Sequence, residues 1–384
     1  MNTFLFWLAV VTVASFLLVA VELLRGRGKL RYLAAVEPLP QSELPLVSVV
    51  VAARDEERNV EEAMGSILAQ DLANIELVVV DDRSADRTGE ILDRMAVADP
   101  RLRVVHVREL PAGWLGKNHA LDLGAADARG ELILFTDADI VMAPDTVRLA
   151  ASYMERERLD HLTMAPRIDM PGFLLQAFGV LFGICFLLFS RPWKARDPRS
   201  ASHIGIGAFN LVRASSYRSI GTHRAIAMRP DDDMKLGKLM KKNGQRQDFL
   251  VAVTHVSVEW YRSIPEAVRG LRKNGFAGLD YRVSMVVFAT LTQLAFMIFP
   301  FIAIFLTVGP TRWIYAFSVA MILGLFGGAA REQRAPVWGG IAVPFASLLF
   351  IVIVWNATLY ALIHRGIEWR GTHYPLDELR ANRV

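Results

Sequence analysis

Hydrophobic and polar residues are unevenly distributed along the chain, with long apolar runs near both ends and mixed segments between them. The first run, Thr3–Leu24, contains one charged residue, Glu22. Three later runs contain no charged side chain: Val283–Val308, Trp313–Ala330 and Trp338–Ile363. About 20 apolar residues span the hydrocarbon core of a bilayer, so each run predicts a transmembrane helix. A transporter would need charged groups inside such helices, and their absence from the three runs favours an anchor.

Basic residues beside the apolar runs predict which side of the membrane each part occupies. Four of them follow the first run: Arg25, Arg27, Lys29 and Arg31. A cleaved signal peptide would carry its positive charge before the apolar run. The positive-inside rule places the following region in the cytoplasm. Three further crossings would leave the tail outside, although Arg365, Arg370, Arg380 and Arg383 favour the inside. The number of C-terminal crossings stays open.

Another apolar run, Phe173–Ser190, interrupts the middle of the chain. If it crossed the membrane, the polar motifs before and after it would lie on opposite sides. We therefore predict an interfacial helix at the membrane surface. An ordinary buried core helix is the alternative.

Between the apolar ends, short β-branched runs alternate with amphipathic segments. The expected strands are 46–52, 75–80, 102–106 and 131–135, and the expected helices are 55–70, 88–96 and 118–128. Ser84 and Asp86 are expected to cap the second helix. Such alternation predicts an α/β fold with a mostly parallel sheet covered by helices on both faces. The expected domains are an N-terminal anchor (1–33), a cytoplasmic domain (34–282) and a C-terminal membrane region with a tail (283–384).

Polar clusters follow three of the predicted strands, at Arg54–Glu57, Asp81–Ser84 and Asp137–Asp139. Ligands of parallel sheets bind at the carboxyl ends of strands, so we expect these clusters to converge on one crevice. Asp137 and Asp139 offer two oxygen ligands for Mg²⁺ or Mn²⁺ carrying a diphosphate. Acids at 81 and 82 could bind the sugar or base of a nucleotide.

Two glycine-containing loops and one acidic run are further candidates. The loop Gly113–Asn118 could bring backbone amides and Lys117 to a phosphate, although an ordinary turn is the alternative. The loop Gly205–Asn210 could approach a ligand closely. In Asp231–Asp233, repulsion between carboxylates would raise one pKa toward that of a general base. Acids also favour helix N-termini, so both interpretations remain.

Composition excludes several classes of protein. The chain has 384 residues, of which 53% are hydrophobic, and a formal net charge of +4. The mean hydropathy is +0.30. One cysteine, Cys185, excludes a framework of intrachain disulfides. Lysine and arginine are dispersed, so no nucleic-acid partner is expected. The turn after the first strand is acidic and lacks G-x-G-x-x-G, which argues against sugar nucleotidyltransferases and Rossmann dehydrogenases.

Taken in order, six segments resemble the family-2 glycosyltransferases, whose fold is the nucleotide-sugar-binding GT-A domain. They are Ala52–Glu57, Asp81–Ser84, Gly116-Lys117, Asp137–Asp139, Gly205–Asn210 and Asp232–Gly237. The resemblance covers residues 46–275. It depends on the order and spacing of all six segments, because each alone is common.

The resemblance implies roles for individual residues. The nucleotide-sugar-binding residues would be Ala53, Arg54, Glu56, Asp82, Lys117, Asp137 and Ala138. Asp139, with Asp137, would ligate Mg²⁺ or Mn²⁺. Asp233 would be the general base of an inverting single displacement, but Asp232 stands where the family has glutamate, so either aspartate could be the base. Asp55 also stands where the family commonly has asparagine.

The Gln-x-x-Arg-Trp motif of processive synthases is absent. In its place are Trp260, Tyr261 and Arg262, which with Gly207, Phe209 and Asn210 would close over donor and acceptor. The chain thus resembles nonprocessive lipid glycosyltransferases, such as ceramide glucosyltransferases and enzymes of carotenoid and hopanoid metabolism. The resemblance implies an integral membrane enzyme with a cytoplasmic active site. Its donor would be a nucleotide-sugar, with UDP-hexose expected, and its acceptor a membrane lipid hydroxyl.

Two alternatives accompany this expectation. A polyprenyl-phosphate sugar synthase would use a phosphate acceptor, which needs no strong base. A non-catalytic membrane scaffold with a transferase-like domain would be expected to have lost carboxylates, yet Asp82, Asp137, Asp139 and Asp233 are all present.

Overall fold

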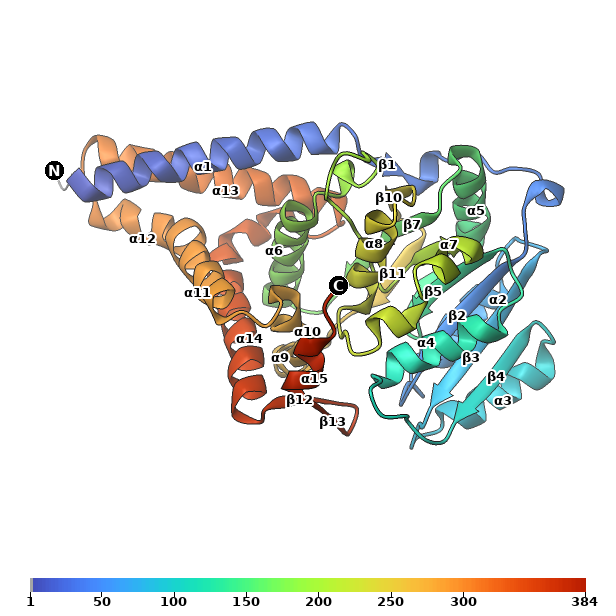
Figure 1. Cartoon of the computed structure of the whole chain (residues 1–384). Helices are drawn as coiled ribbons and strands as arrows, with labels where there is room; N and C mark the ends of the chain where they lie inside the picture. The colour runs from blue at the N-terminus through green and yellow to red at the C-terminus, as the bar shows by residue number, and fades with distance from the viewer. Residues whose placement is uncertain (1–2) are drawn as a thin grey trace. The chain divides into compact units, whose positions relative to one another are not determined.

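The protein is described by a computed structural model that covers residues 3–384, and within these residues the chain forms two compact units. The helical unit consists of residues 3–29, Ile168–Ser190 and Trp260–Ile367. The sheet unit consists of Leu30–Arg167, Arg191–Glu259 and Glu368–Val384. Each unit is therefore assembled from stretches that are far apart in sequence, as the colours of Figure 1 show.

The helical unit contains the apolar runs of the chain. Its longer helices are α1 (Thr3–Arg27), α6 (Phe173–Ser190), α11 (Val283–Thr292), α12 (Phe299–Leu306), α13 (Pro310–Glu332) and α14 (Val343–Ile363). The shorter ones are α9 (Ile264–Gly270), α10 (Arg272–Gly275), η5 (Ala277–Leu279), η6 (Gln293–Ile298) and η7 (Val337–Ala342). Within residues 3–384, five stretches are long and apolar enough to cross a membrane.

Helix α1 lies along α13, with which it is side by side in Figure 1. The Tyr315 hydroxyl donates to the Leu5 carbonyl at 3.1 Å, and Arg27 pairs with Glu332 at 2.7 Å. A second core joins α6, α13 and α14 through buried Phe178, Phe326 and Ile353. The run expected as one helix after Arg282 is not regular, because the π-helical turn η6 separates α11 from α12.

The sheet unit is built on a sheet that has eight strands within the described residues, in the order β1-β10-β7-β9-β5-β2-β3-β4. These strands are β1 (Arg31–Tyr32), β2 (Val47–Ala53), β3 (Ile75–Asp82), β4 (Leu102–Val107), β5 (Leu132–Asp137), β7 (His161–Ala165), β9 (Asn210–Arg213) and β10 (Gln247–Val251). Strand β9 runs antiparallel to β5 and β7, and the other neighbours are parallel. The mostly parallel sheet predicted from the sequence is confirmed.

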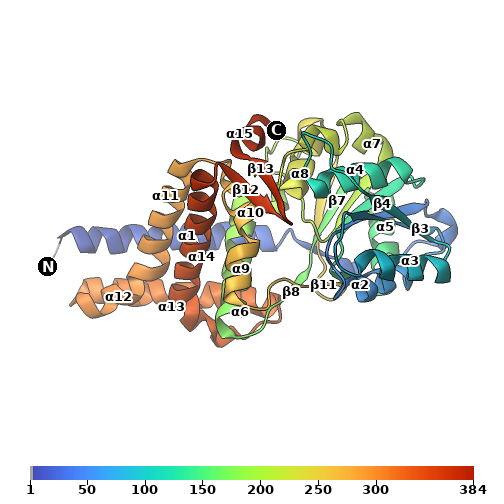
Figure 2. The same cartoon turned by 90° about the horizontal axis from the view of Figure 1, so that it is seen from below.

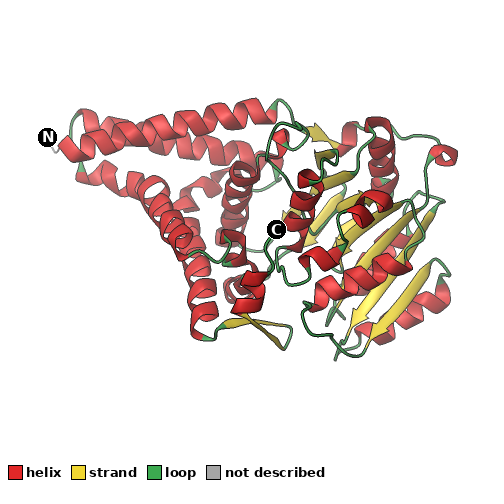
Figure 3. Ribbon diagram, viewed as in Figure 1, coloured by secondary structure: helices red, strands yellow, loops and turns green. Residues whose placement is uncertain are grey.

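Shorter elements complete the chain. The remaining strands are β6 (Ile140–Met142), β8 (Arg167–Asp169), β11 (Val256–Glu259), β12 (Gly366–Trp369) and β13 (Thr372–Pro375). The short helices are η1 (Leu33–Ala35), η2 (Gln41–Glu43), η3 (Pro192–Lys194), η4 (His223–Ile226), α7 (Ala214–Ser219) and α15 (Leu376–Ala381). Figure 3 shows how the strands concentrate in the sheet unit.

Helices cover both faces of the sheet, as Figure 2 shows. They are α2 (Val60–Leu68), α3 (Thr88–Ala98), α4 (Gly116–Asp127), α5 (Thr146–Glu157) and α8 (Asp232–Lys242). On one face, α4, α7 and α8 bury a core that includes Val50, Leu121, Phe135, Tyr217 and Leu236. Strand β2 is almost wholly buried because helices occupy both of its faces, which explains its run of apolar residues.

The first helix of the sheet unit begins later than predicted. The acidic residues from Asp55 were expected to open a helix, but α2 begins at Val60. Asp55 has a φ of 54°, which lies in the left-handed region and excludes it from a regular helix. The residues between β2 and α2 form a loop at the carboxyl edge of the sheet.

Candidate active site

The carboxyl ends of β2, β3 and β5 meet at one edge of the sheet. Strand β2 lies between the other two, with Ala53 opposite Asp81 and Ala52 opposite Asp137. Because all three strands are parallel, the polar residues that follow them are brought to the same edge. The structure thus brings together the three clusters that the sequence places at strand ends.

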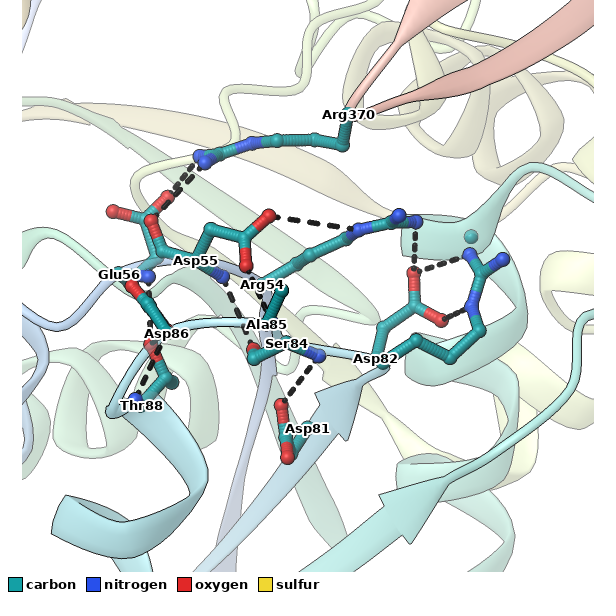
Figure 4. Close-up of polar contacts among 12 residues, drawn as sticks. Arg54, Asp55, Glu56, Asp81, Asp82, Ser84, Ala85, Asp86, Thr88 and Arg370 are labelled. Carbon is teal, nitrogen blue, oxygen red and sulfur yellow. Dashed lines mark hydrogen bonds and ion pairs between the residues drawn. The ribbon is translucent and has the colours of Figure 1, made fainter.

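One group of charges, the arginine-rich cluster, consists of Arg54, Asp55, Glu56, Asp82 and Arg83. Asp82 is 3% exposed and accepts two hydrogen bonds from the Arg83 guanidinium, at 2.8 and 3.0 Å. The Arg54 guanidinium lies 3.6 Å from the same carboxylate. The hydrogen bond with Asp82 raises the pKa of Arg83. Figure 4 shows Arg54 and Asp82 side by side in this cluster.

The loop after β2 is held by side chains that follow β3. The Asp55 amide donates to the Ser84 hydroxyl at 3.0 Å, and the Glu56 amide donates to the Thr88 hydroxyl at 2.8 Å. The expectation that Ser84 caps α3 is therefore wrong, because Ser84 holds the neighbouring loop (Figure 4). Asp86 does accept from the Thr88 amide at the start of α3, at 3.0 Å.

A second group, the aspartate cluster, consists of Lys117, Asp137, Asp139, Asp232 and Asp233. The Lys117 ammonium lies 2.7 Å from Asp137 Oδ1 and 3.5 Å from Asp232 Oδ2. Burial alone would lower the pKa of Lys117, but the charges of Asp137, Asp232 and Asp233 outweigh burial and raise it. Lys117 is thus a permanently charged group that joins the end of β5 to the start of α8.

Asp233 is held by the loop that precedes β9. The Gly207 amide donates to Asp233 Oδ2 at 2.8 Å, and the Met234 amide donates to Oδ1 at 2.7 Å. A Cβ atom on Gly205 would lie 1.8 Å from the Asp233 carbonyl oxygen, and one on Gly207 would lie 2.7 Å from Asp137 Oδ2. The loop can approach both aspartates this closely because these positions are glycine.

Four residues of the aspartate cluster, all except Asp139, line one pocket. Its lining residues are Lys117, Leu121, Phe135, Thr136, Asp137, Gly207, Asn210, His223, Asp232, Asp233 and Leu236. Burial, reinforced by the charge of Asp232, raises the pKa of Asp233 to about 7, although Lys117 acts in the opposite direction. A carboxylate with such a pKa can accept a proton near neutral pH.

The residues expected to ligate a metal have suitable chemistry. Asp137 is the last residue of β5, and Asp139 directly precedes β6. Burial and the nearby charges of Asp137 and Glu56 raise the pKa of Asp139 to about 7, so a divalent cation here would relieve repulsion between carboxylates. Within residues 3–384, no group of three or more His, Cys, Asp or Glu side chains could hold a metal. Two protein carboxylates with substrate phosphates are a common ligand set for Mg²⁺.

The other predicted residues lie in three places. Ala53 and Ala138 are buried beside the two clusters, 1% and 4% exposed. Phe209 and Asn210 are buried where the 205–210 loop enters β9. Trp260, Tyr261 and Arg262 belong to the helical unit. There Trp260 contacts Phe182, with ring centroids 4.9 Å apart.

Sequence reasoning named Asn210 but missed the buried row of polar side chains to which it belongs, with His161 and Gln247. Gln247, His161 and Asn210 lie on neighbouring strands and are hydrogen-bonded in that order, at 2.6 and 3.0 Å. Burial lowers the pKa of His161 to about 4, so the neutral ring donates to Asn210 and accepts from Gln247. Asn210 and Gln247 then accept from the amides of Ile206 and Ile204. Polar residues within apolar strands were the available signal.

The chain is similar in sequence to a family of glycosyltransferases and to several curated enzymes. Residues 48–221 match the glycosyl transferase family 2. A 4,4'-diaponeurosporenoate glycosyltransferase of Staphylococcus haemolyticus is 24% identical over 219 residues, which are 55% of this chain and 56% of that protein. A beta-monoglucosyldiacylglycerol synthase of Trichormus variabilis is 32% identical over 126 residues, 31% of this chain and 25% of that protein. The matches span between about a third and just over half of the length of the first curated relatives.

A solved structure is similar over nearly its whole length. The mannosyltransferase PcManGT from Pyrobaculum calidifontis, in complex with GDP-Man and Mn²⁺, has a TM-score of 0.57 and 19% identity. The alignment covers 93% of this chain and 99% of that one. At this identity, the similarity shows a shared fold.

Proposed function

Because residues 48–221 match the glycosyl transferase family 2 and the chain shares the fold of a solved mannosyltransferase, we propose that the protein is a nonprocessive, inverting glycosyltransferase with a GT-A domain. It transfers a single sugar from a nucleoside-diphosphate sugar to a hydroxyl group of a membrane lipid. The expected donor is a UDP-hexose.

The arrangement of the aspartate cluster is the observation that carries this proposal. Lys117 pairs with Asp137 and Asp232, and Asp233 lines the same pocket beside the 205–210 loop. A cation of raised pKa suits a diphosphate, and a half-buried carboxylate whose pKa is about 7 suits a hydroxyl that must lose its proton. Both groups face one pocket, as a single displacement requires.

The reaction assigns a role to each cluster. In the arginine-rich cluster, Glu56 and Asp82 bind the base and ribose of the donor, with Ala53 and Arg54 beside them. In the aspartate cluster, Asp233 takes the proton from the acceptor hydroxyl as its oxygen bonds to the anomeric carbon. The bond from that carbon to the diphosphate breaks, and the nucleoside diphosphate leaves. Asp233 later releases the proton to solvent.

Asp233 is assigned as the base instead of Asp232 because of their contacts. The Lys117 ammonium pairs with Asp232 at 3.5 Å, so this carboxylate is engaged in an ion pair. Asp232 in turn raises the pKa of Asp233. Asp139 and Asp137 would hold Mg²⁺ or Mn²⁺, which would neutralise charge on the departing diphosphate.

Two features support a lipid acceptor. Five stretches of residues 3–384 could cross a membrane, which would keep the protein where lipids are. The names of two relatives refer to lipid-like molecules, a diaponeurosporenoate and a monoglucosyldiacylglycerol. Holding enzyme and acceptor in one bilayer raises their effective concentration.

We also propose that the sheet unit and the tail share the cytoplasmic side. Strands β7 and β9 are hydrogen-bonded neighbours on either side of α6, and residues 368–384 belong to the same unit. A bilayer cannot divide one sheet unit, so α6 begins and ends on one side, as an interfacial or re-entrant helix would. Residues 260–367 then cross an even number of times, so the three candidate spans after Arg282 do not all cross.

The test is release of nucleoside diphosphate by membranes that contain the protein. UDP-, GDP- and dTDP-sugars are supplied with Mg²⁺ or Mn²⁺, and separate samples receive no acceptor, a total lipid extract or a polyprenyl phosphate. The matched control is Asp139→Ala. We expect release from one donor that lipid stimulates and that the control lacks.

Other outcomes would change the assignment. Stimulation by polyprenyl phosphate alone would indicate a phosphate acceptor and remove the need for a base. Binding of a nucleotide-sugar without release under any condition would contradict the proposed transfer to a lipid in the extract. Absence of both binding and release would indicate a non-catalytic scaffold.

A further inference from the structure

The C-terminal tail, residues 368–384, contacts the loop that follows β2. Strands β12 and β13 form a hairpin whose turn is Arg370-Gly371. The Arg370 guanidinium donates to the Asp55 carbonyl at 3.1 Å and pairs with the Glu56 carboxylate. Figure 4 shows Arg370 reaching from the hairpin to this loop. A residue more than 300 positions downstream thus fixes a carboxylate of the arginine-rich cluster.

A second side chain of the hairpin, Tyr374, interacts with Arg83 of the same cluster. Tyr374 is 5% exposed, and its hydroxyl accepts from the Gly116 amide at 3.2 Å. A hydrogen bond with Tyr374 also helps to raise the pKa of Arg83, after the larger effect of Asp82. The hairpin therefore contacts Glu56 directly and reaches Asp82 through Arg83. The Tyr374 hydroxyl also occupies the Gly116 amide, which belongs to the loop whose amides could, from the sequence, bind a phosphate.

The backbone at the turn gives an independent indication. Arg370 and Gly371 have φ values of 49° and 73°, as a two-residue hairpin turn of type I′ requires. Asparagine is the residue preferred before the glycine, and arginine is strained in this region. Strained positions that persist are a reason to look for function, and here the side chain at the strained position contacts the loop.

The last residues of the tail contact residues 225–238, away from the 54–57 loop. Asn382 accepts from the Met228 amide at 2.9 Å and donates to the Ala225 carbonyl at 3.1 Å. The Lys238 ammonium donates to the Val384 carbonyl at 2.7 Å. Leu379 is fully buried. The hairpin is thus held from its C-terminal side by the segment leading to α8 and by α8 itself.

We propose that Arg370 and Tyr374 are positioning residues of the donor site. By holding Glu56, Arg83 and the 54–57 loop, they prepare the arginine-rich cluster for a nucleoside diphosphate before it arrives. This inference rests on the proposed function, in which Glu56 and Asp82 bind the nucleoside. Thermodynamic linkage then requires the bound nucleotide to stabilise the docked hairpin by the same factor.

The first experiment measures nucleotide affinity in variants of the full chain in detergent. UDP and GDP are titrated with Mg²⁺ by calorimetry, together with dTDP and ADP. Arg370→Asn removes the guanidinium but suits the turn, so the hairpin is expected to persist. We expect about a tenfold loss of affinity, because a charge-assisted contact to the loop is lost. Arg370→Lys keeps the charge and should recover part of that loss.

Two further variants sharpen the result. Tyr374→Phe removes only the hydroxyl and should weaken binding about threefold. Arg365→Asn is the matched control, because Arg365 also has a positive φ, 51°, where α14 ends. That control should bind nucleotide like the natural sequence. In turnover assays, Arg370→Asn should raise the donor KM while kcat changes less than about twofold.

The reciprocal experiment is hydrogen exchange of residues 366–375. The same nucleotide should slow exchange of the hairpin amides in the natural sequence and do so less in Arg370→Asn. Unchanged affinity in Arg370→Asn and Tyr374→Phe, with unchanged hairpin exchange, would overturn this inference and leave the proposed function standing. Failure of all four nucleotides to bind the natural sequence would overturn both.

Discussion

Two groups of carboxylates lie at the same edge of one sheet, and they differ in how many positive charges pair with them. In the arginine-rich cluster, Asp82 lies between two guanidinium groups and Glu56 pairs with Arg370. In the aspartate cluster, Lys117 pairs with Asp137 and Asp232, while Asp139 and Asp233 both have a pKa raised to about 7. Once Arg370 is included, the first group is charge-balanced, and the second has an excess of acids.

The difference indicates what each group is prepared for. Balanced ion pairs give a fixed arrangement of hydrogen-bonding groups, which suits recognition of a nucleoside. An excess of closely spaced acids favours entry of cations and protons, because either relieves repulsion between carboxylates. The aspartate cluster is therefore suited to a divalent metal and to an acceptor proton.

The largest effect should come from removing a carboxylate of the proposed metal pair. We expect Asp139→Ala to lower kcat by about 1,000-fold or more, because several kcal/mol of charge stabilisation on the leaving diphosphate would be lost. The measurement is nucleoside diphosphate release during titration with Mg²⁺ and Mn²⁺. The exposed variant Asp145→Ala is the control. Metal-stimulated turnover retained in Asp139→Ala would remove this residue from the metal site.

The next effect tests the base. Asp233→Asn should lower kcat by about 100- to 1,000-fold, as expected when a general base is lost, and should leave donor affinity nearly unchanged. Single-turnover kinetics and calorimetry separate the two quantities. The comparison variant is Asp232→Asn, and a larger loss of kcat there would transfer the role of base to Asp232. Loss of donor binding in Asp233→Asn would contradict the assignment.

The pH dependence of kcat should follow the raised pKa of Asp233. A base must be ionised to act, so kcat should fall as pH decreases through about 7, by about tenfold from pH 8 to pH 6. Lys117 lowers the pKa of Asp233, so Lys117→Gln should move this limb of the profile to higher pH. The measurement is kcat against pH at saturating donor. A limb unmoved by Lys117→Gln would mean that another group titrates.

Much of this arrangement could be predicted from the sequence, because its signals are local. Runs such as Val47–Ala53 show β-branched residues buried on both faces, and the acids that follow the strands mark the edge where ligands bind. Parallel pairing then places Asp81 and Asp137 beside the end of β2 without further information.

The rest depends on contacts between distant residues. Helix α2 starts late because amides of the preceding loop bond to side chains about 30 positions downstream, such as Ser84 and Thr88. Strand β9 pairs with β5 and β7, which precede it by more than 40 residues. An Arg-Gly pair can be read as a turn, but no local pattern indicates that Arg370 contacts Glu56.

The smallest effect should come from the balanced cluster. Arg83→Gln removes the guanidinium that donates twice to Asp82. Arg54 remains 3.6 Å from the same carboxylate, so Asp82 keeps one positive partner and the loss of affinity is expected to be small. We expect about a fivefold loss of affinity for the nucleoside diphosphate, with kcat and its pH dependence unchanged, because no acid of the aspartate cluster is altered. Calorimetry and a pH profile on the same preparation measure both. A shift of the pH limb in Arg83→Gln would show that the two clusters are electrostatically coupled and do not act as separate sites.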